Sequence, residues 1–317
     1  MKRRTGQDRS ITTQWKPATQ AIRGGTARSE FGETSEALFL TSGYAYDCAG
    51  DAAARFSGEQ QGMTYSRLQN PTVQMLEERI ALLEGAEACR AQATGMAAMT
   101  AALLCQLEAG DHLVGGRAAF GSCRWLTDTL LPKFGIQTTI VDTRDTQAFE
   151  DAIQPNTKVF FFETPANPTM DIADLEAICG IAKRHGITTV IDNAFATPAL
   201  QRPMEFGADV VAYSATKMMD GQGRVLAGAV CGSQDFIENT LLPCPAPAQA
   251  VGCVVDTFYE PFLNPPFLVG PQHEADNFQN PLLFRVNDLP EPASLALVGI
   301  GCVGLFAGRR RRLSPRP

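Results

Sequence analysis

Residues 210–217 of this chain read VVAYSATK, and residues 188–193 read TTVIDN. Each stretch begins with a short run of apolar and β-branched residues, which is typical of a strand buried in a parallel sheet. Each run ends in polar residues, and open α/β sheets bind their ligands at the carboxyl ends of such strands. The two stretches therefore predict an α/β fold with candidate ligand-binding groups after both strands.

Lys217 and Asp192 are the candidate catalytic residues at these two strand ends. A lysine that forms a Schiff base with an aldehyde, and an aspartate that keeps a pyridine nitrogen protonated, are what pyridoxal-phosphate chemistry requires of a protein. Each residue alone also has an ordinary interpretation, as a polar strand end or a solvated surface lysine. The cofactor interpretation therefore depends on phosphate-binding groups elsewhere in the chain.

Candidate phosphate ligands occur in two places. Ser214 and Thr216 offer two hydroxyl groups beside the lysine. Thr94 opens an alanine-rich helical pattern, so we expect it to cap that helix and to leave the N–H groups of Gly95 and Met96 facing an anion at the positive helix end. An ordinary N-cap is the alternative interpretation of Thr94.

Composition limits the class of protein. The 317 residues, 44% of them hydrophobic, suffice for one large α/β domain with appendages, and the net charge of −7 argues against nucleic acid as a partner. The nine cysteines are scattered without metal-ligand spacing, so we expect no metal site and reduced thiols. Polar residues follow the basic N-terminus, so we expect no secretory signal peptide and a cytoplasmic location.

Periodicity divides the chain into four parts. Residues 1–61 have little periodicity and are expected to form an N-terminal arm that packs against another subunit. Residues 62–242 alternate helices with strands, which implies a mostly parallel sheet covered on both faces. The predicted strands are residues 112–115, 137–141, 158–162, 188–191, 210–213 and 225–231, and the predicted helices lie near residues 73–83, 94–104, 121–131, 146–152 and 172–185.

The last two parts have a different character. Residues 243–289 are rich in proline and are expected to be irregular. Residues 290–317 begin with Pro-Glu-Pro, continue through an uncharged apolar run at 293–308, and carry four consecutive arginines. This tail resembles a PEP-CTERM sorting signal of exported bacterial proteins, and its apolar run could contact a membrane.

Ordered motifs between residues 17 and 242 resemble the Cys/Met-metabolism family of pyridoxal-phosphate enzymes, most closely its O-succinylhomoserine sulfhydrylase branch. The matching stretches are Ala18–Thr26, Leu40–Tyr44, Tyr65–Arg67, Asn70–Thr72, Leu83–Glu87, Phe120–Cys123, Glu163–Pro168, Asp192–Pro198 and Tyr213–Lys217.

The resemblance implies roles for individual residues. Lys217 would bind pyridoxal 5'-phosphate covalently and Asp192 would pair with its ring nitrogen. The implied phosphate ligands are Ser214, Thr216 and the backbone N–H groups of Gly95 and Met96.

Further implied contacts come from other segments. Tyr65 and Arg67 would reach the phosphate of a neighbouring subunit, so a homo-oligomer with shared sites is expected. Asn167 would bind the phenolic oxygen of the cofactor, and Phe120 would stack on its ring where many relatives have tyrosine.

The implied fold is the large domain of a fold-type I pyridoxal-phosphate transferase, with the small C-terminal domain missing or replaced after about residue 242. The implied reaction converts O-succinylhomoserine and sulfide to homocysteine, in methionine biosynthesis. We expect this chain to be weakly active or inactive, because no arginine after Arg224 resembles the family's carboxylate-binding residue.

Two alternatives remain open. One is a cystathionine γ-synthase or γ-lyase of the same family. Phe120 argues against it, because a phenol at that position assists the leaving group in those relatives. The other is a non-catalytic product tethered to a membrane through residues 293–308.

Overall fold

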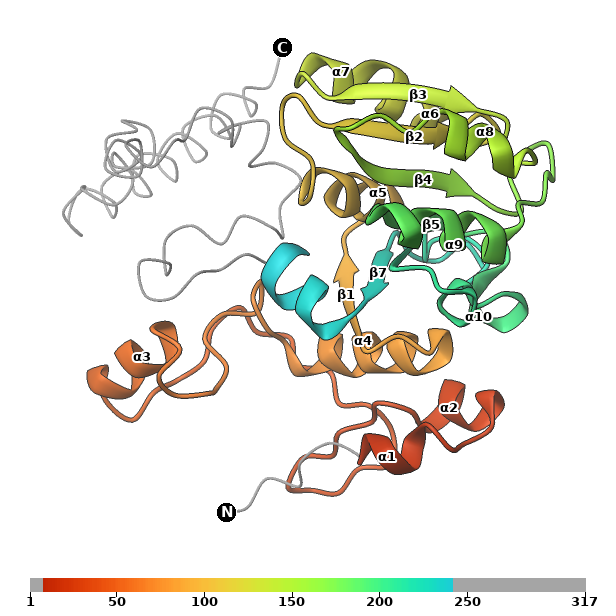
Figure 1. Cartoon of the computed structure of the whole chain (residues 1–317). Coiled ribbons are helices and arrows are strands. Elements are labelled where there is room, and N and C mark those ends of the chain that lie inside the picture. Colours follow the sequence, from red (N-terminus) through yellow and green to blue (C-terminus); the bar gives the residue numbers. More distant parts are fainter. Residues whose placement is uncertain (1–7, 242–317) are drawn as a thin grey trace, which may run out of the picture. The chain divides into compact units, whose positions relative to one another are not determined.

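A seven-stranded sheet forms the centre of the protein in the computed structural model, which describes residues 8–241 (Figure 1). The expected irregular segment 243–289 and the tail 290–317 lie outside these residues. The strands are β1 (Ala88–Gln92), β2 (His112–Gly116), β3 (Gln137–Val141), β4 (Thr157–Glu163), β5 (Thr188–Asp192), β6 (Val210–Tyr213) and β7 (Gly228–Gly232).

The strand order is β1-β7-β6-β5-β4-β2-β3. The pairs β2–β3, β2–β4, β4–β5 and β5–β6 are parallel, whereas β7 is antiparallel to both β6 and β1. Because β7 is antiparallel to both of its neighbours, β1 and β6 run in the same direction. The carboxyl ends of β1, β2, β4, β5 and β6 therefore lie at one edge of the sheet, and the expected mostly parallel α/β fold is confirmed.

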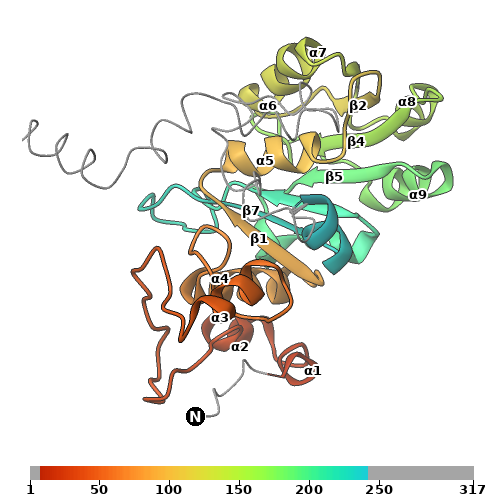
Figure 2. The ribbon, with the colours of Figure 1, turned by 90° about the vertical axis from the view of Figure 1, so that its left-hand side faces the viewer.

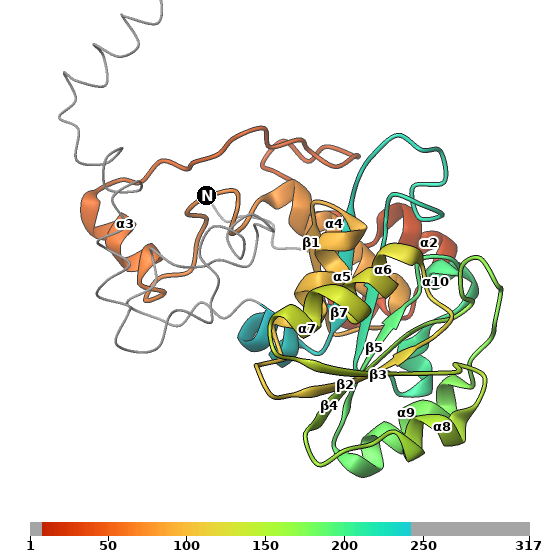
Figure 3. The ribbon, with the colours of Figure 1, turned by 90° about the horizontal axis from the view of Figure 1, so that it is seen from above.

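Helices cover both faces of this sheet (Figures 2 and 3). On one face lie α5 (Gly95–Leu104), α6 (Gly121–Trp125), the π-helical turn η1 (Leu126–Leu130) and α7 (Leu131–Lys133). On the other face lie α4 (Pro71–Glu84), α8 (Thr146–Asp151) and α9 (Leu175–His185). The remaining elements are α1 (Arg9–Thr12), α2 (Pro17–Arg23), α3 (Ala49–Phe56), α10 (Thr197–Leu200), the 3₁₀ turn η2 (Pro203–Phe206) and the π-helical turn η3 (Phe236–Leu241).

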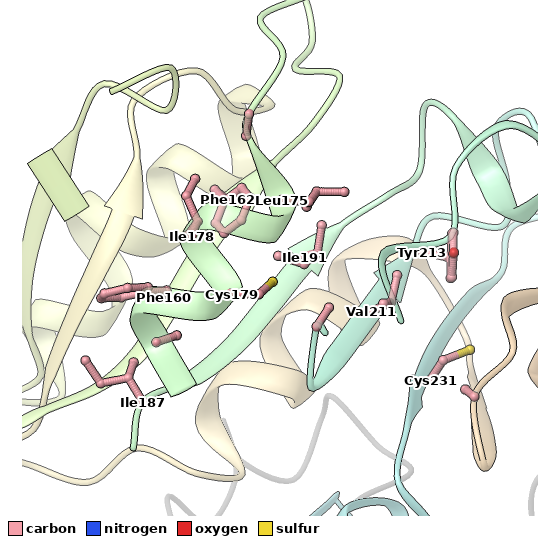
Figure 4. Packing of buried hydrophobic residues seen from close by; sticks show 14 of the residues in the cluster. Phe160, Phe162, Leu175, Ile178, Cys179, Ile187, Ile191, Val211, Tyr213 and Cys231 are labelled. Atoms are coloured by element: carbon pink, nitrogen blue, oxygen red, sulfur yellow. The ribbon is translucent and has the colours of Figure 1, made fainter. Parts of the chain in front are cut away.

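Strand β4 shows how a run of apolar residues serves two cores. Phe160 and Phe162 point to one face, where both rings meet Phe149 edge-on at centroid distances of 5.2 and 5.4 Å. Figure 4 shows Phe160 and Phe162 packed with residues of α9 such as Ile178. Phe161 belongs to the core on the opposite face. Since each buried phenylalanine contributes about 1.5–3 kcal/mol, this strand stabilises both layers.

Helix α4 forms where its capping residues predict it. The Asn70 side chain accepts a hydrogen bond from the Thr72 N–H at 2.9 Å, and Pro71 occupies the first helical position. Gly85 ends the helix with φ of +81°, a left-handed conformation that favours glycine. The predicted helix between Asn70 and Gly85 is confirmed.

Some elements differ from the sequence-based expectation. Strand β1 was not predicted, because Ala88–Gln92 mixes small and polar residues without alternation. Helix α9 begins at Leu175 rather than near residue 172, because Asp174 caps it by accepting the Ala177 N–H. The arm contains the short helices α1, α2 and α3, and Arg79 of α4 donates a hydrogen bond to the Gly24 carbonyl at 2.8 Å.

Two kinds of feature are absent from residues 8–241. No group of His, Cys, Asp or Glu in this part of the chain is arranged to hold a metal ion. No helix in it is long and apolar enough to cross a bilayer. The apolar run at 293–308 lies outside the described residues.

Candidate active site

The predicted site residues follow strands that end at the same edge of the sheet. Gly95 follows β1, Phe120 follows β2, Asn167 follows β4 and Ser214 follows β6, while Asp192 is the last residue of β5. Parallel neighbours in a sheet bring their following loops together, so residues far apart in sequence share one edge.

Asp192 is a buried carboxylate, only 4% exposed. One of its oxygens accepts the Ala194 N–H at 3.0 Å, and the other lies 3.8 Å from the Cys123 sulfur, whose thiol donates to it. Burial raises the pKa of Asp192 to about 6. No basic side chain of residues 8–241 pairs with it, so a protonated pyridine nitrogen is the kind of group this carboxylate would bind.

The two predicted phosphate-binding segments are in contact. A Cβ on Gly95 would lie 2.4 Å from the Cβ of Ser214, and a Cβ on Gly228 would lie 2.2 Å from the Thr94 carbonyl oxygen. Thr94 caps α5 as predicted, because its hydroxyl accepts the Ala97 N–H at 3.0 Å. Thr94 accepts the N–H groups of Ala97 and Ala98 through its hydroxyl and its carbonyl. The N–H of Gly95, at the start of the first turn, has no acceptor within the helix.

Met96 follows Gly95 in the same first turn, so its N–H also lacks an acceptor within α5. The positive end of α5 and the Ser214 loop thus form one cradle at the sheet edge. Its glycine-lined geometry suits a phosphate group.

Thr216 and Lys217 continue this loop. The Thr216 hydroxyl donates to the Ala227 carbonyl at 3.1 Å and accepts the Ala227 N–H at 2.9 Å, which ties the loop to the residues before β7. Thr216 would hold a phosphate only by sharing these bonds. Lys217 is exposed, and its backbone N–H donates to the Ser214 carbonyl at 3.1 Å.

A buried hydrogen-bond network lies at the carboxyl ends of β5 and β6. Tyr213 is fully buried, and its hydroxyl donates to the carboxylate of Glu84 at the end of α4. Asn193 donates to the Tyr213 oxygen at 2.8 Å and to the Gln201 carbonyl at 2.9 Å. Tyr213 and Asn193 are the chain neighbours of Ser214 and Asp192, so this network positions both. Reading the sequence alone did not identify it.

Glu163, at the end of β4, also went unrecognised as a single residue. It is 3% exposed, and its carboxylate accepts the Phe120 N–H at 2.7 Å and the Asn167 N–H. The sequence signal was an acidic residue ending an otherwise apolar strand. The Phe120 ring itself is 42% exposed and Asn167 is half-buried at the same edge.

Tyr65 and Arg67 lie on the segment between α3 and α4. Tyr65 pairs with Gly43 in a β-bridge, and the Arg67 guanidinium lies 5.7 Å from the centre of the Tyr65 ring. Arg90 of β1 donates to the carbonyls of Arg67 and Leu68, which anchors this segment to the sheet. Their contact with a neighbouring subunit's phosphate stays a prediction.

A hollow of about 360 Å³ lies elsewhere, between α10 and η2. It is lined by residues 198–202, 205 and 206, none of which is a predicted cofactor contact.

Known proteins are similar to this chain in sequence and in structure. The family model for Cys/Met metabolism PLP-dependent enzymes matches residues 18–260, and the model for the PEP-CTERM protein-sorting motif matches residues 288–312. The O-succinylhomoserine sulfhydrylase of Mycobacterium tuberculosis is 48% identical over 222 residues, covering 70% of this chain and 55% of the relative. The L-methionine gamma-lyase of Porphyromonas gingivalis is 41% identical over 226 residues, covering 71% of this chain and 57% of the relative.

A solved structure is similar as well. A protein from Campylobacter jejuni assigned as an O-acetylhomoserine (thiol)-lyase is 36% identical with a TM-score of 0.67, covering 72% of this chain and 56% of that chain. It carries a pyridoxyl-lysine monophosphate. The chain spans about half the length of the curated relatives it matches.

The cofactor is pyridoxal 5'-phosphate, which supplies an aldehyde for a lysine and an electron-withdrawing ring. The buried Asp192, which no basic side chain of residues 8–241 neutralises, and the contact between Gly95 and Ser214 fit the two ends of that molecule. With the match over residues 18–260, these features show that the chain belongs to the Cys/Met metabolism family of pyridoxal-phosphate-dependent enzymes.

Proposed function

We propose that this chain is a sulfhydrylase that converts O-succinylhomoserine and sulfide to homocysteine with pyridoxal phosphate. The observation that carries the proposal is the convergence of Asp192, Ser214 and Gly95 at one sheet edge, with Lys217 on the Ser214 loop. The similarity to sulfhydrylases and the Phe120–Cys123 motif favour this member of the family.

The chain's own residues have definite tasks in this reaction. Once the Lys217 amine is no longer bound to the cofactor, its Nζ atom would act as a general base and take the proton from the substrate Cα. Asp192 would stay ionised and hold a proton on the ring nitrogen of the cofactor. Succinate would leave from the substrate Cγ, and sulfide would add at the same carbon.

We propose a low rate for this chain. Between Arg224 and the arginines that begin at Arg309, Arg285 is the sole arginine, and its surroundings do not resemble the family's carboxylate-binding motif. Loss of a bidentate anchor removes orientation worth on the order of several kcal/mol.

The test is an assay of the purified chain with O-succinylhomoserine and sulfide. Homocysteine should form slowly, well below the roughly 10 s⁻¹ typical of enzymes, and formation should cease in Lys217→Ala. Succinate release without any homocysteine would contradict the proposed reaction. A rate typical of enzymes would contradict the proposed loss of the carboxylate anchor.

A γ-lyase is a second candidate, favoured by the similarity to a methionine gamma-lyase. A lyase needs no sulfide and releases ammonia from methionine. Ammonia release that depends on Lys217 in the absence of sulfide would favour it.

A third candidate is a membrane-tethered product without catalysis, favoured by the match of residues 288–312 to the PEP-CTERM motif. Residues 293–308 would then contact the membrane, and the chain would sediment with membranes. A cytoplasmic enzyme, which we propose, would stay in the supernatant, and deletion of residues 290–317 would not change its distribution.

A further inference from the structure

Glu163 joins two segments that follow different strands, namely the start of α6 after β2 and the loop after β4. Its carboxylate accepts the N–H of Phe120, 43 residues earlier in the chain, at 2.7 Å. It also accepts the N–H of Asn167, in the loop that follows β4. One side chain therefore holds the backbone of two residues that would contact the cofactor ring and its phenolic oxygen.

Glu163 is also a neighbour of Asp192, the predicted partner of the cofactor's ring nitrogen. Glu163 and Asp192 are paired in register at the ends of the parallel strands β4 and β5. Cys123, three residues after Phe120, donates its thiol to Asp192. The start of α6, from its N-cap Phe120 to Cys123, is thus attached at both ends to buried carboxyl groups.

Burying an acidic side chain at position 163 costs free energy, and an apolar side chain would pack there without that penalty. The four preceding residues of β4, Val159–Phe162, are apolar and buried, and a further apolar residue would extend that pattern. A buried carboxyl group is unfavourable unless its oxygens accept hydrogen bonds. Glu163 obtains those bonds from the Phe120 and Asn167 backbones.

With the cofactor bound, we expect Glu163 to be neutral and Asp192 to be ionised. Burial, together with the neighbouring Asp192 carboxylate, raises the pKa of Glu163 to about 7. A cationic ring nitrogen at Asp192 would favour the ionised form of Asp192, and the second carboxyl group of such a pair then retains the proton. A neutral Glu163 still accepts hydrogen bonds through its carbonyl oxygen.

We propose that Glu163 is a positioning residue of the cofactor site. By accepting hydrogen bonds from the backbone N–H groups of Phe120 and Asn167, it fixes where these two residues lie relative to the cofactor ring. The inference rests on the proposed contacts of Phe120 and Asn167 with the cofactor. It does not depend on which substrate the protein uses.

Four variants of the full chain test this role. Glu163→Ala removes both hydrogen bonds, Glu163→Asp shortens the reach by one methylene, and Glu163→Gln keeps an acceptor without charge. Glu176→Ala, an exposed acidic residue of α9, is the matched control. Far-UV circular dichroism checks that each variant folds, and if Glu163→Ala does not fold, the comparison of the Asp and Gln variants decides.

The first readout is amide hydrogen exchange without cofactor, in peptides that contain Phe120 and Asn167. Exchange should be faster by about tenfold or more in the Ala and Asp variants, and close to wild type in the Gln and control variants. The second readout is a titration with pyridoxal phosphate followed by visible circular dichroism. The dissociation constant should rise about tenfold in the Ala and Asp variants, with a changed signal from the bound ring.

Unchanged exchange at both amides in Glu163→Ala or Glu163→Asp would overturn the inference. Faster exchange with unchanged cofactor affinity and dichroism would overturn the positioning role and leave a structural one. A Gln variant as impaired as the Ala variant would overturn the argument from a neutral acceptor. If wild type binds no cofactor through Lys217, the proposed function fails, and the exchange measurement separately decides whether Glu163 holds the two segments.

Discussion

Gly95 and Ser214 meet at the carboxyl edge of the sheet so closely that a Cβ on residue 95 would lie 2.4 Å from the Cβ of Ser214. The contact joins the start of α5 to the loop that carries Lys217, across the intervening strand β7. A backbone without a side chain at position 95 is therefore a condition for the two predicted phosphate-binding segments to share one anion.

Gly95→Ala should separate these segments. The added carbon overlaps the Cβ and Cα of Ser214, and relief by backbone movement costs about 1–3 kcal/mol. Affinity for pyridoxal phosphate should fall about tenfold or more, as measured by absorbance titration. Gly180→Ala in the middle of α9 is the control, since its nearest neighbour would be 4.0 Å away, and it should leave affinity unchanged.

Lys217→Ala should abolish the visible absorption band of covalently attached cofactor. The physical reason is that the aldehyde would have no amine at this edge and would bind only reversibly. Lys183→Ala, an exposed lysine of α9, is the control and should retain the band. A band of equal intensity in Lys217→Ala would show that another lysine carries the cofactor.

Asp192→Asn should separate cofactor binding from turnover. The side chain keeps its size but loses the negative charge that holds the ring nitrogen protonated. Turnover should fall about 100-fold or more, while cofactor binding persists. Parallel measurement of the absorbance titration and of homocysteine formation checks both. Normal turnover of the Asn variant would exclude Asp192 as the partner of the ring nitrogen.

Glu84→Gln should change the pH dependence of stability. Burial raises the pKa of Glu84 from 4.5 to about 7, opposed by the hydrogen bond from Tyr213. Because the folded state favours the protonated acid, its stabilising contribution is full below pH 4.5 and is lost as the pH rises to about 7. The loss corresponds to about 3 kcal/mol, and the glutamine variant should lack it.

Denaturant unfolding of wild type and Glu84→Gln at pH 5 and pH 8 measures this difference. Glu176→Gln, an exposed residue, is the control and should follow wild type. Equal pH dependence in wild type and Glu84→Gln would mean that Glu84 ionises in the folded protein without penalty.

Arg67→Ala and Lys217→Ala chains should complement each other if sites are shared between subunits. Mixed oligomers would contain some sites with both Arg67 from one chain and Lys217 from another. Such sites should restore part of the covalent cofactor band, measured after co-refolding with each chain alone as control. Mixed oligomers without any restored band would place Arg67 outside the phosphate site of a neighbouring chain.

Local patterns were sufficient for several elements. Asn70, Pro71 and Gly85 mark the limits of α4, because caps act on the residues next to them. The buried strands β4, β5 and β6 were visible as apolar runs, since a strand covered on both faces has few polar residues. The candidate ligands at their carboxyl ends followed from the same patterns.

Partners distant in sequence could not be predicted in this way. Strand β1 exists because Ala88–Gln92 pairs with β7, about 140 residues later, and its own residues carry no alternation. Glu163 stands in a quoted motif, yet its partners Phe120 and Asp192 approach it only when β2, β4 and β5 are neighbours.

The sequence by itself determined the chemical groups of this protein: Lys217, Asp192, the hydroxyls near the lysine and the capped helix start at Thr94. These are properties of residue type and short spacing. The tertiary structure alone decided that Gly95 touches Ser214, that Glu163 holds Phe120 and Asn167, and that Glu84 supports Tyr213. The reason is physical: burial and hydrogen bonding between distant segments depend on strand order, which no single segment of sequence contains.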